Sequence, residues 1–243
     1  MSGMPALQPP VSAFATAAAA MPAALRSILV DGVDPTAVDA AALRLALQQA
    51  QCYDAPVGHI VQQPAVLPAA ACAALRAAVD AQHETASDSV DNEDDHQLNL
   101  EVDELEALVG AAALQALVGA ARELDARAGG ELPIVEAFVR RYSPSERPWF
   151  PFHQDRSALT VNVALSADAD GCGGQLVCVL DDGARVVGPR AEGDAATHSS
   201  SLVHGVTRLT RGARYSLIVF FGDEPAVRRE LVDGQWVRTL VPR

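Results

Sequence analysis

A histidine and a carboxylate lie two positions apart, as His153 and Asp155, directly before a run of alternating apolar residues. In an extended chain, residues i and i+2 point to the same side, so both side chains can reach one point. Imidazole nitrogen and carboxylate oxygen are the ligands of non-haem iron(II) centres, which use two histidines and one carboxylate and leave other coordination positions open. The pair therefore predicts a metal site that takes a second histidine from elsewhere.

Two of the six histidines, His198 and His204, lie in the strand-rich part of the chain, and both are candidates for that ligand. Arg214 follows His204 by ten positions and begins the run RYSLIVFF, in which Arg214 and Ser216 share one face. A buried arginine beside a hydroxyl is suited to bind a carboxylate, because the guanidinium offers two parallel donors. This strand therefore indicates a site for an organic acid.

The run LTVNVAL predicts a strand with two different faces. Leu159, Val161, Val163 and Leu165 form an apolar face that we expect in the core. Thr160, Asn162 and Ala164 form a small, polar face, as a cavity wall requires. Tyr142 ends an earlier strand-like run and can add a phenolic hydroxyl to the same cavity.

The hydrophobic period changes from helical to strand-like after Gly130. Helices are predicted over residues 34–50, 68–82 and 102–128, with one short strand at 58–62. Strands are predicted over residues 134–142, 158–165, 174–180, 184–188, 200–206 and 214–221, followed by a hairpin that turns at Asp233-Gly234. Helices followed by many short strands predict an α+β, mainly β fold, namely a helix-supported β-sandwich or jelly roll.

The chain divides into three parts on this pattern. Residues 1–25 are expected to be a flexible N-terminal leader, residues 26–130 a helical support region, and residues 131–243 the β core. An acidic segment at 84–97 resembles a calcium loop in its alternating carboxylates, but it lacks the required glycine and closing glutamate. We interpret it as a solvated loop.

Composition limits the class of protein. The chain has 243 residues, 49% of them hydrophobic, which is typical of a globular protein. The net charge of −13 argues against nucleic acid and anionic membranes as partners, and no apolar run is long enough to span a bilayer. The four cysteines have neither zinc-finger nor disulfide-scaffold spacing, which predicts reduced thiols in a cytoplasmic protein. The Ala-rich stretch of the leader resembles the apolar region of a targeting peptide, which is the alternative. No arginine precedes Arg26, so the basic segment that such a peptide begins with is absent, and we expect a flexible leader.

The segments HQD, TVNVAL, the Gly173-Gly174 pair and HGVTRLTRGARYSL, in that order, resemble the iron(II)/2-oxoglutarate dioxygenases, in particular the prolyl and lysyl hydroxylase branch. The resemblance covers about residues 58–222. It implies a double-stranded β-helix, which is a jelly roll, with His153, Asp155 and His204 as the iron ligands. It also implies that Arg214 binds the distal carboxylate of 2-oxoglutarate, assisted by Ser216 and Tyr142, with Asn162 and Thr160 as further cofactor-contacting candidates.

The activity that this resemblance implies is hydroxylation of an unactivated C–H bond in a protein side chain or small metabolite, with release of succinate and CO2. Iron(II), 2-oxoglutarate and O2 are required, and ascorbate is a candidate addition. Cys172 stands where the family has an acidic or aromatic residue, so the substrate, a peptide or a small molecule, is not carried over. The alternatives are a catalytically inactive cupin-like binding module and a zinc enzyme on a β-sandwich, which leaves the Arg214 strand without a role.

Overall fold

The computed structural model describes residues 13–50, 58–82, 84–88, 90–91, 93–124, 132–170, 173–188, 190–222, 226–232 and 235–241. The helices are α1 (Ala13–Ala20), α2 (Ala23–Leu29), α3 (Ala40–Gln49), α4 (Ala69–Ala81), α5 (Val102–Val109) and α6 (Ala111–Leu124), with 3-10 turns η1 (Pro35–Ala37) and η2 (Asp168–Asp170). The strands are β1 (Ile60–Gln63), β2 (Glu84–Ser87), β3 (Asp94–Asn99), β4 (Ile134–Tyr142), β5 (Phe150–His153), β6 (Leu159–Ala164), β7 (Leu176–Leu180), β8 (Gly183–Val186), β9 (Ala195–Ser199), β10 (Val203–Val206), β11 (Arg214–Phe221), β12 (Ala226–Val232) and β13 (Gln235–Val241).

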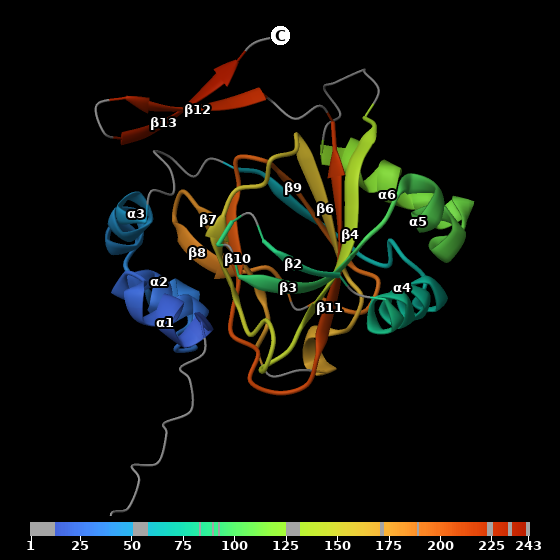
Figure 1. The fold of residues 1–243 in the computed structure, drawn as a ribbon, viewed down its shortest axis with the longest axis horizontal. Helices are drawn as coiled ribbons and strands as arrows, with labels where there is room; N and C mark the ends of the chain where they lie inside the picture. Colours follow the sequence, from blue (N-terminus) through green and yellow to red (C-terminus); the bar gives the residue numbers. More distant parts are fainter. Residues whose placement is uncertain are drawn as a thin grey trace, which may run out of the picture.

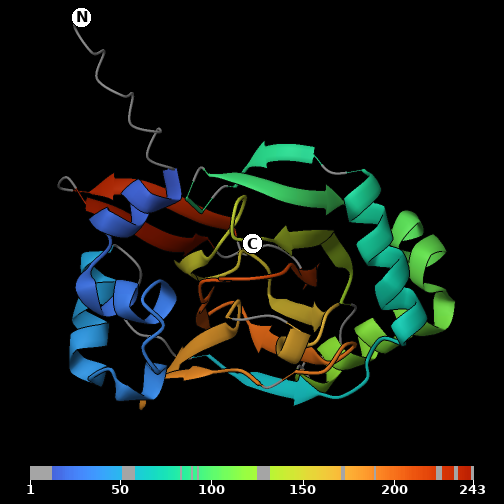
Figure 2. The ribbon, with the colours of Figure 1, turned by 90° about the horizontal axis from the view of Figure 1, so that it is seen from below.

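Two antiparallel sheets form the centre of the described structure. The larger has seven strands in the order β1-β9-β6-β11-β4-β3-β2, and the smaller has four in the order β5-β10-β7-β8. Strands β12 and β13 pair only with each other. Figures 1 and 2 agree that α1–α3 lie on one side of the sheets and α4–α6 on the opposite side.

Each sheet buries its outer face under helices. Apolar residues of α4, α5 and α6 pack on the seven-stranded sheet in one cluster that includes Leu75, Leu105 and Leu117. A second cluster joins α2 and α3 to the four-stranded sheet through residues such as Ile28 and Leu43. Alanine-rich sequences suit these helices, because short side chains let a helix lie close to a sheet.

The inner faces of the sheets enclose a third cluster and the candidate site. Strand β6 is buried at all six positions. Its residues Val161 and Val163 point into the cluster under α4–α6, whereas Thr160 and Asn162 line a cavity together with residues of β5 and β10. The two-faced strand predicted from LTVNVAL is therefore confirmed.

The β pattern predicted from the sequence is largely confirmed. β4 and β11 have the predicted bounds. Three further strands lie inside their predicted ranges, namely β6, β7 and β10, and two begin within two residues of the predicted start, namely β1 and β8. The final hairpin also forms, with Val232 paired to Gln235. Residues 233–234, where its turn was predicted, lie outside the described residues.

Four predictions about the first 130 residues are wrong in part. Residues 13–25, expected in a flexible leader, contain α1 and the start of α2, while residues 1–12 lie outside the described residues. The helix expected over 34–50 is split, since Asp34 accepts from Thr36 N–H at η1 and Asp39 from Ala42 N–H at α3. The helix expected over 102–128 breaks at Gly110, where φ is 85°, so that α5 and α6 are bent by 116°. The fourth is the acidic segment.

The acidic segment 84–97, expected to be a solvated loop, supplies two strands of the larger sheet. β2 pairs with β3, and β3 pairs with β4, which brings His96 opposite Arg141 and Gln97 opposite Arg140. Asp95 is only 3% exposed. Burial of these carboxylates is possible because Arg140 of β4 and Arg147, which precedes β5, form ion pairs with them.

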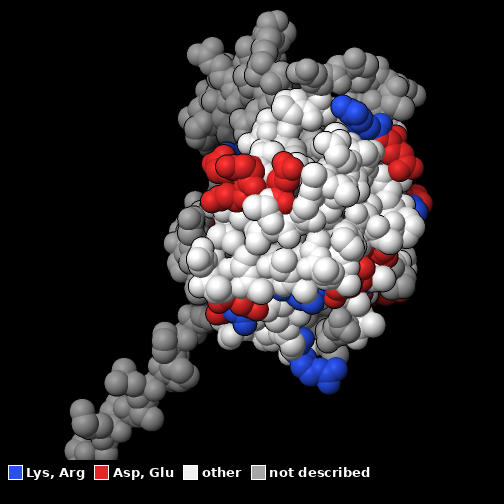
Figure 3. Space-filling model, turned by 90° about the vertical axis from the view of Figure 1, so that its right-hand side faces the viewer, with Lys and Arg blue, Asp and Glu red and all other residues white. Residues whose placement is uncertain are grey.

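Within the described residues, no single helix is long and apolar enough to cross a membrane, and only the bent pair α5–α6 meets the criteria of length and composition. Leu105, Leu114 and Leu117 of this pair are buried against the sheet. The side of the molecule that carries α4–α6 presents mainly uncharged side chains, with separate acidic and basic groups and no continuous basic stripe (Figure 3).

Gly193 fixes a tight turn before β9. Its φ is 89°, and a Cβ atom there would lie 2.2 Å from the carbonyl oxygen of Leu67. We expect Gly193→Ala to lower the free energy of unfolding by about 1–3 kcal/mol, because alanine strains this backbone conformation. Gly119→Ala in α6, where a Cβ meets open space, should instead raise it by about 0.5–1 kcal/mol. Urea unfolding measures both, and equal effects of the two variants would contradict the assignment.

Candidate metal centre

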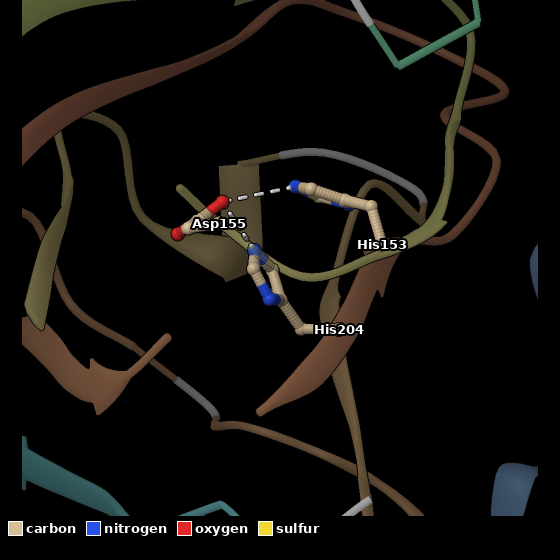
Figure 4. A group of neighbouring side chains, drawn as sticks. All are labelled: His153, Asp155 and His204. Atoms are coloured by element: carbon tan, nitrogen blue, oxygen red, sulfur yellow. Dashed lines mark ion pairs between the residues drawn. The ribbon is translucent and has the colours of Figure 1, made fainter. Parts of the chain in front are cut away.

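Three side chains from two parts of the β core converge at one point. His153 ends β5, Asp155 follows two residues later, and His204 lies in β10 directly opposite His153. Their potential ligand atoms all lie within 4.8 Å of one another. Oδ1 of Asp155 is 3.2 Å from Nε2 of His153 and 3.7 Å from Nε2 of His204 (Figure 4). The structure thus brings together the residues predicted from HQD and His204.

Backbone carbonyls determine which nitrogen of each imidazole carries the proton. Nδ1 of His153 lies 3.0 Å from the oxygen of Pro151, and Nδ1 of His204 lies 3.2 Å from the oxygen of Leu202. A carbonyl only accepts, so each Nδ1 must be the donor, and each Nε2 presents its lone pair toward Asp155. Two lone pairs facing a carboxylate repel unless a cation lies among them. This donor set therefore fits a metal ion, with the ring orientation typical of metal-binding histidines.

The protonation states also suit a metal ion. Burial, followed by the nearby His153, lowers the pKa of His204 well below its ordinary value, which keeps the ring neutral. Burial alone would raise the pKa of Asp155, but positive charge beside its oxygens, which His204, His153 and His198 supply when they are protonated, holds this pKa far below the ordinary value. Asp155 is therefore an anion, and Thr160 donates a hydrogen bond of 2.5 Å to its other oxygen, Oδ2. Thr160, expected to contact the cofactor, lines the cavity and orients this carboxylate.

His198, the other histidine candidate, lies next to His204 and Asp155. It is fully buried in β9, its ring centroid is 4.4 Å from that of His204, and its Nε2 is 3.6 Å from Oδ2 of Asp155. It is not among the three side chains whose ligand atoms converge. The geometry thus favours His204, as the resemblance implied.

A cavity of about 280 Å³ opens from the three residues. Its wall carries the predicted Tyr142, Asn162 and Thr160, together with charged and aromatic side chains. The residues beyond those already named are Asp88, Val90, Gln97, Glu136, Phe138, Arg140, Phe150, Gln154, Arg156, Leu176, Val206, Ile218 and Phe220. Both sheets contribute, so the cavity lies between them.

Arg214 and Ser216 are buried at the start of β11, as predicted, with exposed fractions of 4% and 3%. Arg214 lies opposite Tyr142 in the register between β11 and β4. Its Nη1 donates to Asp168, a carboxylate in the segment before the Gly173-Gly174 pair, so part of this guanidinium already has an anionic partner. Cys172, in the same segment, lies outside the described residues.

A buried network of charged residues beside the cavity was not predicted. Arg140 of β4 pairs with Asp88 and Asp95 at 2.7 Å, and Arg147 pairs with Asp91 at 3.1 Å and Asp95 at 2.9 Å. Both guanidinium groups stack on the ring of Phe150, at 4.6 and 4.3 Å. The acidic hairpin β2–β3 is thus joined to the cavity wall. In the sequence, the alternation of faces along β4 places Arg140 on the same side as Tyr142, and this could have indicated that Arg140 lies near the cavity.

Two arginines and three aspartates leave this network with one excess negative charge, which favours retention of a proton. Burial raises the pKa of Asp95 to about 7, and the neighbouring Asp88 adds to the effect. The pKa of an unfolded aspartate is about 3.9. Between these two values the folded protein binds a proton that the unfolded chain has released. The contribution of Asp95 to the free energy of unfolding therefore falls as the pH rises from about 4 to about 7.

We therefore expect Asp95→Asn to become steadily more stable relative to the unsubstituted protein as the pH rises from 5 to 8. Urea unfolding of both proteins in the presence of a chelator measures the difference and removes the contribution of bound metal. A difference that is constant over this range, or that changes with the opposite sign, would show that Asp95 is already ionised at pH 5.

Known structures share this fold, although no protein-family model and no curated protein matches the sequence. HygX from Streptomyces hygroscopicus, solved with nickel and 2-oxoglutarate bound, is 14% identical and aligns over 67% of this chain and 82% of its own, with a TM-score of 0.53. A prolyl hydroxylase from Trichoplax adhaerens, in complex with a hypoxia inducible factor peptide, is 18% identical. It aligns over 68% of this chain and 84% of its own, with a TM-score of 0.51. AviO1 from Streptomyces viridochromogenes is 19% identical and aligns over 70% of this chain and 92% of its own, also with a TM-score of 0.51. The resemblance to these oxygenases is confirmed for the fold.

Proposed function

We propose that this chain is an iron(II)- and 2-oxoglutarate-dependent oxygenase of the hydroxylase type, built on a double-stranded β-helix. The observation that carries the proposal is the convergence of two Nε2 lone pairs and a carboxylate in the wall of a partly open cavity. Three protein ligands leave coordination positions open for small molecules, unlike a closed structural site.

Each residue of the site has a defined task in this proposal. His153, Asp155 and His204 would hold iron(II), which when bound supplies the chemistry of oxygen activation with 2-oxoglutarate. Thr160 holds Oδ2 of Asp155, so that Oδ1 faces the metal position. Arg214 and Ser216 provide a cation and a hydroxyl at one end of the site for the distal carboxylate of 2-oxoglutarate. Tyr142 and Asn162 form the wall along which 2-oxoglutarate would lie.

The overall reaction would convert a C–H bond of the substrate, 2-oxoglutarate and O2 into an alcohol, succinate and CO2. The substrate would occupy the part of the cavity lined by residues such as Phe138, Phe220 and Arg156. A similar fold holds a peptide in the Trichoplax protein, which supports peptides as well as small metabolites as candidates here. Ascorbate is a candidate addition to the assay.

Calorimetric titration of 2-oxoglutarate into protein loaded anaerobically with Mn²⁺, and into metal-free protein, tests the binding step. We expect binding only in the presence of metal. A screen for succinate release with iron(II), O2 and proline, lysine, arginine or peptide substrates then tests turnover. Metal-dependent binding without succinate release from any substrate would favour an inactive binding module. Tight zinc binding with no 2-oxoglutarate binding would favour a zinc enzyme and overturn the proposal.

A further inference from the structure

A second arginine, Arg190, contacts Asn162, a residue of the cavity wall. It is 2% exposed, and its Nη1 donates to Oδ1 of Asn162 at 2.9 Å and to the backbone oxygen of Asn162 at 3.3 Å. Since arginine only donates, Oδ1 of Asn162 must face Arg190, which leaves the amide NH2 as the free end of this cavity-lining side chain. Asn162 thus connects Arg190 to the cavity.

The two buried arginines, Arg190 and Arg214, lie close enough to repel each other. Burial and then the charge of Arg214 lower the pKa of Arg190 to about 9. One buried carboxylate, Asp168, lies between them: Oδ1 accepts from Arg214 Nη1, and Oδ2 accepts from the backbone N–H of Arg190. Asp194 also acts on Arg190, but it is partly exposed and its oxygens accept from backbone N–H groups of Ala65 and Ala191. The pair of guanidinium groups therefore has more positive charge than Asp168 neutralises.

Several donors of this pair have no partner within the described part of the chain. They are Nε of Arg190 and both Nε and Nη2 of Arg214, and all three are buried. Buried charged donors without acceptors are costly, so their retention indicates an anionic ligand. Excess charge and unused donors are two separate observations that lead to the same conclusion.

We propose that Arg190 is a second binding residue for the distal carboxylate of 2-oxoglutarate, acting together with Arg214. This inference rests on the proposed function. A dicarboxylate with its 2-oxo acid end at His153, Asp155 and His204 would place its other charge toward the two arginines. That charge neutralises the excess positive charge, and Asp168 remains as the internal partner of Arg214. Asn162 acts as a positioning residue, since its amide holds the Arg190 guanidinium.

The test compares 2-oxoglutarate with 2-oxopentanoate, which has the same carbon chain and chelating end but no distal carboxylate. Both are titrated calorimetrically into the Mn²⁺-loaded full chain without O2, for the unsubstituted protein, Arg190→Gln, Arg190→Lys and the control Arg185→Gln. Arg185 lies in β8 of the smaller sheet and forms an exposed ion pair with Asp182, whereas Asn162 lies in β6 of the larger sheet. The Mn²⁺ affinity of each variant reports whether the site is intact.

We expect Arg190→Gln to weaken 2-oxoglutarate binding by about 10–100-fold, the effect of one charge-assisted hydrogen bond, and to leave 2-oxopentanoate binding within about threefold. Arg190→Lys keeps the charge and should lose less, while Arg185→Gln should lose nothing. Unchanged 2-oxoglutarate affinity in both Arg190 variants, or an equal loss for the two acids, overturns the role of Arg190 while the proposed function stands. If the unsubstituted Mn²⁺-loaded protein binds neither acid, the proposed function and this inference fail together.

Discussion

Replacement of His153 by alanine is expected to weaken Mn²⁺ or iron(II) binding by at least about 100-fold, the upper range for loss of a group that merely supports a metal ligand. His153 supplies one of the three converging ligand atoms, and two remaining ligands hold a divalent ion poorly. The fold should be retained, because His153 is the last residue of β5 and alanine keeps the backbone pairing of that strand. Anaerobic calorimetric titration with Mn²⁺ measures the affinity.

His59→Ala is the matched control for this prediction, since His59 is exposed at the start of β1 and is not part of the converging group. It should bind Mn²⁺ like the unsubstituted protein. If His153→Ala bound Mn²⁺ within about threefold of that protein, the ion would have to bind elsewhere, and the assignment of the site would be wrong.

Replacement of Arg147 by methionine is expected to lower the free energy of unfolding by about 3–5 kcal/mol, the range observed when one partner of a buried ion pair is removed. Arg147 is fully buried and pairs with Asp91 and Asp95, and its guanidinium stacks on Phe150 and Phe14. Methionine fills much of the same volume but leaves the carboxylates with less compensation. The loss should also loosen the β2–β3 hairpin from the cavity wall.

Urea unfolding measures this effect, with Arg26→Met as the control because the Arg26–Asp31 pair is about half exposed. The control should cost no more than about 0.5 kcal/mol. On an Asp95→Asn background, Arg147→Met should cost less than it does alone, since one of the carboxylates left behind is then absent. Equal costs of Arg147→Met and Arg26→Met would show that the buried network does not stabilise the fold.

The sequence could predict those elements whose local pattern matches their final environment. β4 and β11 are runs rich in β-branched and aromatic residues in the middle of the larger sheet, and Pro133 before β4 and Gly212 and Gly222 around β11 mark where they begin or end. β9, with the sequence AATHS, has no such pattern and is a strand because β1 and β6 pair with it on either side. Propensity is weak evidence for a strand in that position. Gly110, by contrast, was a readable signal for the break between α5 and α6.

The candidate site shows the same division. His153, Asp155, His204, Arg214, Thr160, Asn162 and Tyr142 were found from spacing, parity and family resemblance, and the structure brings the first three together and places Thr160, Asn162 and Tyr142 on the cavity wall. Arg190 lies in an irregular segment and Asp168 in the short turn η2, where no period predicts which way a side chain points. Arg140 and Arg147 are buried because aspartates about 50 residues earlier return as β3 beside β4. Such charge pairing depends on long-range topology, which a single sequence does not reveal.

A crystal structure of the protein soaked anaerobically with Mn²⁺ and 2-oxoglutarate would test the metal assignment. We predict one ion bound by Nε2 of His153, Nε2 of His204 and an oxygen of Asp155, with 2-oxoglutarate chelating the ion and its distal carboxylate near Arg190 and Arg214. An ion that also bound Nε2 of His198, closing the site with a fourth protein ligand and excluding 2-oxoglutarate, would contradict the proposed oxygenase.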